Sequence, residues 1–265
     1  MTRRRRAGVA GAVLLLALIV CGPLIAAHPA TAPVAPAFSP PGTGGPLGTD
    51  QLGRDVLARL LHGSLPLLLT SVLGAVLGTA LGALAGLSGA LAAIRHPRIE
   101  PLVTRPLDVL AAVPPILVLL LVLTALPSRT GLVLAVVLSG LPLSARVARA
   151  AADQVTGRAH VEAALARGES WWWLLGREVL PLVGGTLLAD LGLRFVTAVY
   201  LVAAAGFLGL GTGDSDWGLM IVEALPGAAL QPWALLAPMI GVALLAVTAN
   251  LLADGAGARA RGVLA

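Results

Sequence analysis

The sequence predicts an all-α integral membrane protein with six transmembrane helices, on the basis of composition, chain length and the placement of charge. Of 265 residues, 57% are apolar and only 12% are charged, whereas about a quarter of the residues of a soluble domain are charged. The mean hydropathy of +0.92 is that of a chain lying mostly in lipid. The length suits about six spans of roughly 20 residues with short loops.

The first predicted span covers residues 7–27, after a cytosolic N-terminus of residues 1–6 that carries four arginines. A cleaved signal peptide is the alternative, because Ala26-Ala27 resembles a cleavage site. The apolar run is about 20 residues long, beyond the usual ~7–15 of a signal core, so an uncleaved span is favoured.

Residues 28–64 read as an external linker, rich in Pro and Gly, that ends in a short amphipathic helix around residues 55–62. Asp55 and Arg59 are four residues apart, so we expect them to pair on one helix face. The helix either contacts an external partner or is simply solvated. The candidate residues of this external interface are Asp50, Arg54, Asp55, Arg59 and, further along the chain, Trp217.

Residues 65–255 are expected to form a core of five further spans, before a cytosolic tail of residues 256–265. Pro114-Pro115 lies inside the third span, where it must free backbone groups and kink the helix. In the second span a glycine at every fourth position predicts a close contact with another helix. The expected spans are about 65–89 (with Gly74, Gly78, Gly82 and Gly86), 107–126, 131 to the region of Arg146 and Arg149, 182–207, and 234–253.

The arginines predict that both termini and the loop of residues 146–181 are cytoplasmic. All 18 basic residues are arginine, and 14 of them lie in segments that this orientation places inside. Only Arg54, Arg59 and Arg129 lie in outer segments, which is the asymmetry of the positive-inside rule.

Several function classes are excluded or disfavoured by composition. A P-loop needs a lysine on the phosphates and the chain has none, so it is not itself a conventional ATPase. The pI of 11.1 comes from arginines at membrane edges, which disfavours nucleic-acid binding. The four histidines are scattered without ligand spacing, so no metal site is predicted. Neither a nucleophile elbow nor paired catalytic carboxylates occur.

Charges inside predicted spans are candidates for a translocation pathway. Asp190 and Arg194 are four apart on the fifth helix and can pair on one face. Each alone would cost about 2.5–3.5 kcal/mol at a span centre, so the pair should face the bundle or a wet cavity. A buried structural pair, or one near the inner interface, remains the alternative. Further candidate pathway residues are Asp108, Pro114 and Pro115.

The polar loop of residues 146–181 predicts a short cytosolic helix held against the bilayer. Residues 155–167 have helical spacing, and Gly168 can end that helix in a left-handed conformation. Trp171 to Trp173 suit the headgroup region. Pro181 is expected to limit the start of the next helix. The loop is either a docking element for a cytosolic partner or a plain re-entry loop.

This loop resembles the EAA loop of importer-type ABC permeases, which reads Glu-Ala-Ala, three residues, Gly, nine residues, Ile-x-Leu-Pro. Here the Ile position is Glu178, and the other elements fall at that spacing. The resemblance implies a type I importer-like permease fold in which cytosolic ATPases dock on the loop. The residues that carry this coupling role by resemblance are Glu162, Ala163, Ala164, Gly168, Leu180 and Pro181.

Four further segments resemble the second, C-type permease subunit of dipeptide, oligopeptide and nickel importers. The family commonly has a glutamate where this chain has Val202, a difference that bears on cargo. The matching segments are residues 48–59, Phe207-Leu208-Gly209-Leu210-Gly211 with Trp217-Gly218, residues 250–255, and Asp108.

The resemblance implies a permease subunit of an ATP-driven importer in the bacterial inner membrane, with dipeptides as the expected cargo. Longer oligopeptides or nickel are alternatives within the family, and a gradient-driven secondary transporter is the alternative from another class. The implied partners are a homologous second permease, cytosolic ATPase subunits that bind ATP and Mg, an extracytoplasmic solute-binding protein and the lipid bilayer. No cofactor is expected in this chain.

Overall fold

The computed structural model describes residue 11, residues 16–95, 98, 100–211, 213 and 215–263, and for residues 95, 103 and 252–263 the backbone alone. Helices form the regular elements of this part, with two isolated β-bridges in the linker before α2. The helices are α2 (Val56–Arg95), α3 (Glu100–Ala112), α4 (Pro115–Ala125), α5 (Arg129–Thr156), α6 (Ala159–Ala166), α7 (Trp171–Trp173), the π-helical segment Leu174–Val179, α8 (Leu180–Phe207), α9 (Trp217–Ala224), the 3-10 helix Leu225–Gly227 and α10 (Pro232–Val263).

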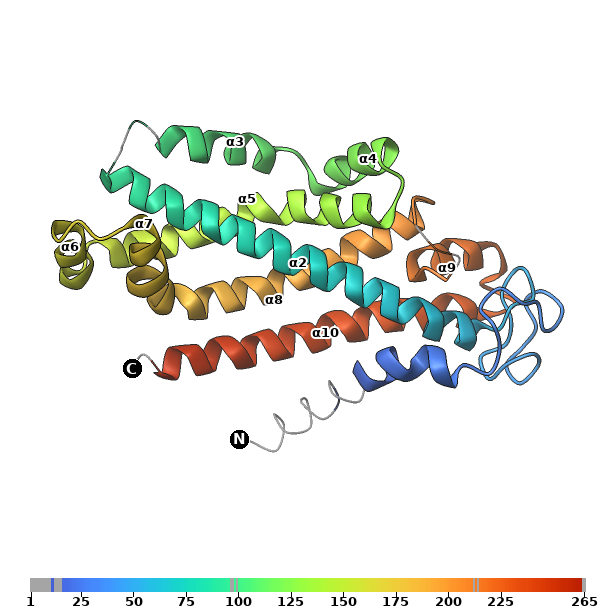
Figure 1. Ribbon diagram of the computed structural model, residues 1–265. Helices are drawn as coiled ribbons and strands as arrows, with labels where there is room; N and C mark the ends of the chain where they lie inside the picture. The colour runs from blue at the N-terminus through green and yellow to red at the C-terminus, as the bar shows by residue number, and fades with distance from the viewer. Residues whose placement is uncertain are drawn as a thin grey trace.

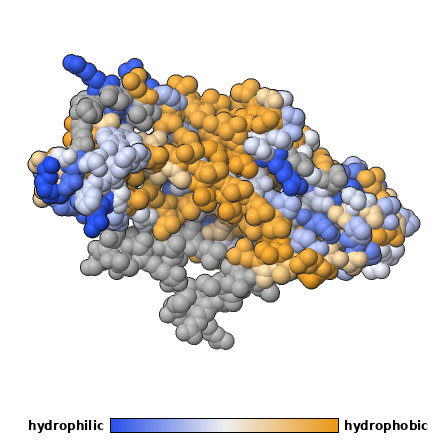
Figure 2. Space-filling model, viewed as in Figure 1, coloured by the Kyte–Doolittle hydropathy of each residue, from blue (hydrophilic) through white to orange (hydrophobic). Residues whose placement is uncertain are grey.

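Long helices run side by side along the molecule, with α6 and α7 at one end and α9 with the linker at the other (Figure 1). Figure 2 shows an apolar band across the middle of the visible face and polar residues at both ends. This is the surface pattern of a protein embedded in a bilayer. We refer below to the α6 end and the α9 end.

Four helices of the described part are long and apolar enough to cross a membrane, and α3 with α4 makes a fifth if the bent pair counts as one span. The all-helical membrane fold is therefore confirmed, and six spans are not. Of the predicted first span, 7–27, the structure describes the short apolar helix Leu16–Ile25, and much of the remainder lies outside the described residues.

The kink expected at Pro114-Pro115 is present, because α3 and α4 meet there at an angle of 93°. Pro115 is the first residue of α4, and Pro114 before it is extended, with φ −56° and ψ 134°. A proline disfavours helical conformation in the residue before it and lacks an N–H for the preceding turn, so two in succession separate the helices. Both prolines are exposed at this break.

The separate amphipathic helix expected around residues 55–62 is wrong, because α2 begins at Val56 and continues for 40 residues. Asp55 marks its start, since Asp55 Oδ1 accepts a hydrogen bond of 2.9 Å from the Leu57 N–H. Side-chain acceptance of an early N–H is what a helix start requires. Pro66 lies inside the helix without ending it.

The glycine stripe of α2 packs against α5, as its spacing predicts. A β-carbon added to Gly82 would lie 2.5 Å from the Leu141 carbonyl oxygen, and one added to Gly74 would lie 2.5 Å from Val136 Cγ1. Two helix backbones approach this closely only where side chains are missing. The glycine stripe thus allows the close approach of α2 and α5.

Two apolar clusters fill the bundle. The larger one joins α2, α4, α5, α8, α9 and α10 and includes Leu119, Val199 and Leu245. The smaller one joins α2, α5, α6, the π-helical segment and α8, and includes Leu91 and Ala164. The loop at the α6 end is therefore part of a packed core and not a loose connection.

Candidate coupling loop and polar sites of the bundle

Helix α6 ends in a backbone conformation that glycine favours. Gly168 has φ +75°. Its N–H donates to the Leu165 carbonyl at 3.0 Å, and the Glu169 N–H donates to the Ala164 carbonyl at 3.2 Å. These two bonds form a Schellman motif, which satisfies the last carbonyls of a helix. The predicted left-handed glycine after α6 is confirmed.

The two faces of α6 differ sharply in exposure. Val161 and Ala164 are fully buried, and Ala164 belongs to the smaller apolar cluster. Glu162, Ala163 and Gly168 are exposed. Of the Glu-Ala-Ala triplet, only the first two side chains can meet another protein directly, and Ala164 anchors the helix to the bundle.

Helix α8 begins at Leu180 with Pro181 in its first turn, as predicted. It follows α7 and the π-helical segment without a break, so that residues Trp171–Phe207 form one helical stretch. Ser170 caps α7 by accepting a hydrogen bond from the Trp173 N–H at 3.3 Å. The π-helical segment follows, and the Leu180 N–H reaches back five residues to the Leu175 carbonyl. A wide turn of this kind accommodates the missing N–H of Pro181. Leu180 and Pro181 are both exposed.

Asp190 and Arg194 on α8 form the ion pair that their spacing predicts, with Arg194 Nη2 3.1 Å from Asp190 Oδ1. The structure adds a third member, because Ser144 Oγ on α5 donates to Asp190 Oδ2 at 2.5 Å. Asp190 and Ser144 are both buried. A lone serine in an apolar run carries no periodic signal, so sequence reasoning missed Ser144. We call these three residues the α5–α8 polar cluster.

Asp108 lies in a different place from this polar cluster. Its Oδ1 accepts a hydrogen bond of 2.8 Å from Arg146 Nη2, and both side chains are more than half exposed. Both line a cavity of about 230 Å³ between α3 and α5, whereas Arg194 lines a smaller space beside Gly74 and Gly78. The structure therefore does not gather the candidate pathway residues into one site.

The charged residues of the external candidate interface are buried within the chain, so of the two alternatives the solvated helix is wrong. Arg59 Nη1 donates to Asp50 Oδ2 and to Glu223 Oε2, each at 2.7 Å. Arg54 donates to the same two carboxylates at 2.7 and 2.9 Å. We call Asp50, Arg54, Arg59 and Glu223 the α9-end ion network.

The expected pairing of Asp55 with Arg59 is wrong as well. Asp55 Oδ2 instead lies 2.9 Å from Nδ1 of His28. Trp217 is buried at the start of α9, and its Nε1–H donates to the Leu60 carbonyl at 2.9 Å. Sequence reasoning missed Glu223, although a single carboxylate in the apolar stretch of α9 was a usable signal.

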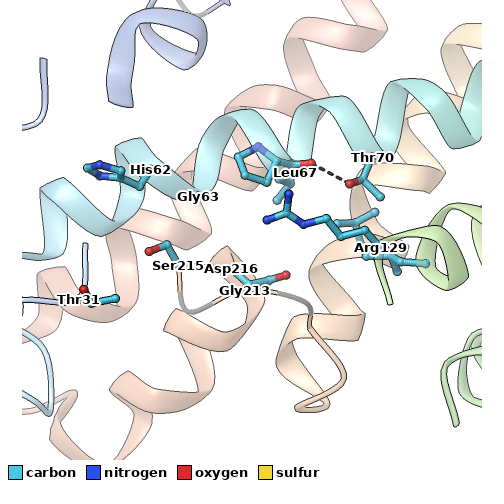
Figure 3. A pocket seen from close by; sticks show the side chains of 12 residues that line it. Thr31, His62, Gly63, Leu67, Thr70, Arg129, Gly213, Ser215 and Asp216 are labelled. Atoms are coloured by element: carbon cyan, nitrogen blue, oxygen red, sulfur yellow. Dashed lines mark hydrogen bonds between the residues drawn. The ribbon is translucent and has the colours of Figure 1, made fainter. Parts of the chain in front are cut away.

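A polar cavity of about 230 Å³ opens at the α9 end, between the first turns of α2 and α5, the second half of α8 and the loop before α9. Figure 3 shows the Arg129 side chain reaching into it, opposite Ser215 and Asp216. Val202, at the position where the family resemblance expects a glutamate, is buried in its wall. We call this space the α9-end cavity.

Asp216 lies at the edge of this cavity, directly before α9. Its Oδ1 accepts a hydrogen bond of 2.8 Å from the Gly218 N–H and so caps α9. Burial raises the pKa of Asp216 to about 6.

Among the residues that the structure describes, no three His, Cys, Asp or Glu side chains converge as metal ligands.

Comparison with known proteins assigns the chain to a family. Residues 78–261, well over half of the chain, match the family described as the binding-protein-dependent transport system inner membrane component. The chain belongs to this family. It is thus a membrane permease subunit of an ABC importer, and ATP hydrolysis belongs to other chains of such a transporter.

Three relatives place this permease among peptide permeases. DppC of Pseudomonas aeruginosa, a di/tripeptide transport system permease protein, is 33% identical over 212 residues, which cover 79% of this chain and 69% of DppC. DdpC of Escherichia coli, a probable D,D-dipeptide permease, is 29% identical over 92% of this chain and 82% of its own length. OppC of Bacillus subtilis, an oligopeptide permease, is 27% identical over 92% and 80%.

The permease also shares its fold with a solved transporter. A chain of the MetNI methionine ABC transporter in an inward-facing conformation aligns with a TM-score of 0.59 at 17% identity. The alignment covers 74% of this chain and 95% of that chain. The type I importer permease fold that the resemblance implied is confirmed by this likeness.

Proposed function

We propose that this chain is the second, C-type permease subunit of an ATP-driven importer whose cargo is dipeptides. The observation that carries the coupling role is the two-faced α6, with Glu162 and Ala163 exposed and Ala164 buried in the bundle. The similarity to DppC and DdpC supports the peptide cargo.

The packing of α6 suggests how force from an ATPase reaches the spans. Ala164 shares one apolar cluster with Leu174 and Val179, which lead into α8, and with Ala152 of α5. Because protein interiors are close-packed, a push on the exposed face of α6 is transmitted to both helices. The α5–α8 polar cluster then makes the two helices move together, and the Pro114-Pro115 break is where α3 and α4 can change angle.

The proposed assembly has the N- and C-termini and the α6 end in the bacterial cytoplasm. The proposed partners are a homologous second permease, cytosolic ATPase subunits that supply the ATP and Mg sites, and an extracytoplasmic binding protein that delivers the cargo. The Gly168 Schellman motif keeps the ATPase-facing surface of α6 in one orientation.

The test is purification of the chain from its native membrane in mild detergent, followed by mass spectrometry and peptide uptake. Co-purification of a sister permease and an ATPase, with dipeptide uptake that stops on ATP depletion while the ion gradient persists, is the expected result. Uptake that instead follows the gradient would establish a secondary transporter. Preferential uptake of longer peptides or nickel would correct the cargo alone.

A further inference from the structure

The α9-end cavity holds a cation that the structure leaves without an anionic partner. Figure 3 shows Arg129, at the start of α5, extending its guanidinium toward Thr70 and Leu67 of α2. The Arg129 side chain is exposed. It forms no ion pair with a described residue, whereas Arg54 and Arg59 at the same end of the bundle each do.

The carboxylates that the structure describes near this end are already engaged. Asp50 and Glu223 accept hydrogen bonds from Arg54 and Arg59, and Asp55 lies against His28. Asp216 directs Oδ1 to the N-terminus of α9. Asp216 shares the cavity with Arg129 but forms no ion pair with it, so among the described residues no carboxylate binds the Arg129 guanidinium.

The remaining walls combine hydroxyls with a small apolar surface. Thr70 and Ser215 supply hydroxyl oxygens, and Leu132 and Val202 supply the apolar wall. Thr70 already donates to the Pro66 carbonyl at 2.8 Å, which leaves its oxygen as an acceptor. A planar guanidinium with five donors suits a carboxylate, which it can bind through two parallel hydrogen bonds.

We propose that the α9-end cavity binds the C-terminal carboxylate of an incoming peptide, with Arg129 as its ligand. This inference rests on the proposed peptide cargo and adds a site to it. The cavity of about 230 Å³ is smaller than the usual ~300–1,000 Å³ of drug-sized pockets, so it suits one end of a peptide. The apolar wall formed by Leu132 and Val202 would then contact a small side chain next to that carboxylate.

The experiment uses the complete transporter, with its partner chains and binding protein, in proteoliposomes. Uptake of alanyl-alanine is compared with uptake of alanyl-alanine amide, which lacks the carboxylate. Arg129→Gln should lower kcat/KM for the free dipeptide about tenfold or more, the loss for one charge-assisted hydrogen bond, and leave the amide within about twofold. Arg129→Lys retains the positive charge but lacks the two parallel N–H donors of the guanidinium, so its kcat/KM for the free dipeptide should lie between those of the wild type and Arg129→Gln.

Arg105→Gln, a change at an exposed arginine of α3 outside the cavity, is the matched control and should alter neither cargo. Equal loss for both cargoes in Arg129→Gln, or no loss, would overturn the carboxylate site while leaving peptide import intact. A defect that follows the anionic-lipid content of the vesicles and ignores the cargo would assign Arg129 to lipid headgroups. Failure of the wild-type transporter to import either cargo would remove the proposed function and this site with it.

Discussion

Gly86 of α2 and Ala145 of α5 lie in direct backbone contact, so that a β-carbon on Gly86 would overlap the Ala145 carbonyl oxygen. The same two helices are in close contact at Gly82, one turn earlier, where a β-carbon would lie 2.7 Å from Ser144 Cβ. Ser144 in turn donates to Asp190, so this contact places α2 next to the α5–α8 polar cluster. The contact therefore joins packing of the bundle to the polar residues inside it.

Gly86→Ala should lower the thermal stability of the purified permease. The added methyl forces the two backbones apart, and overpacking of this kind costs about 1–3 kcal/mol. Gly184→Ala in α8 is the matched control, because no atom lies within 4 Å of its added β-carbon. The control should be neutral or more stable, since alanine favours helix over glycine by about 1 kcal/mol. Equal melting temperatures for the two variants would contradict the close contact.

Gly168→Val should uncouple ATP hydrolysis from uptake while the chain remains inserted and assembled. The left-handed conformation costs a residue with a side chain about 1–2 kcal/mol, so the turn after α6 should reorganise and α6 should lose its fixed orientation. Gly157→Val is a control with the same added volume, an equally open surrounding and φ −83°. ATPase activity and uptake are measured in parallel; normal coupled uptake in Gly168→Val would reject the lever role.

Ala163→Glu and Ala164→Glu should fail in different ways. The exposed Ala163 side chain belongs to the proposed ATPase-facing surface, so its substitution should abolish ATPase co-purification without changing the melting temperature. The fully buried Ala164 would place an unpaired carboxylate in the apolar cluster, at a cost of several kcal/mol, and should destabilise the whole chain. Indistinguishable behaviour would mean that α6 does not present two faces.

Asp50→Asn should destabilise the permease by about 3–5 kcal/mol, because it leaves two buried guanidinium groups with one carboxylate fewer. Asp108→Asn removes the carboxylate of an exposed pair and should cost about 0–1 kcal/mol. Thermal unfolding in detergent separates the two cases. A small effect at Asp50 would show that the α9-end ion network contributes little to stability.

Asp216 should make stability decrease as pH rises from about 4 to about 6. Burial raises the pKa of Asp216 from 3.8 to about 6, so within that window the folded chain keeps a proton that the unfolded chain releases. Asp216→Asn should remove this decrease and keep the cap, since an amide oxygen also accepts a backbone N–H. The difference between wild-type and variant melting temperatures, taken across the window, isolates this group from other carboxylates. A constant difference would contradict the raised pKa.

The helices that were well predicted are those that the apolar pattern delimits by itself. The span expected from residue 131 onward corresponds to α5. The span expected to end at Phe207 does so in α8, and the span expected to begin near residue 234 begins at Pro232 in α10. The turn at Gly168 was predicted because its chemistry is local. The start of α2 was misplaced, because the charged residues 54–59 look like surface when read alone.

The polar sites were predicted only where both partners share one helix. Asp190 and Arg194 are four residues apart, and the structure shows their pair. Glu223 lies 169 residues from Arg54, and Ser144 lies 46 residues from Asp190, so tertiary packing alone brings each pair together. The angle at Pro114-Pro115 likewise depends on what α3 and α4 pack against.

The α9-end ion network has a consequence for the order in which the chain matures. Arg59 leaves the ribosome 164 residues before Glu223, an interval on the order of ten seconds at ordinary rates of synthesis. Until then, Asp50 is the one carboxylate of this network that has been synthesised, and Glu223 has yet to join it. The α9 end of the bundle can therefore close only near the end of translation, and a chain truncated before α9 would leave both arginines without the Glu223 carboxylate.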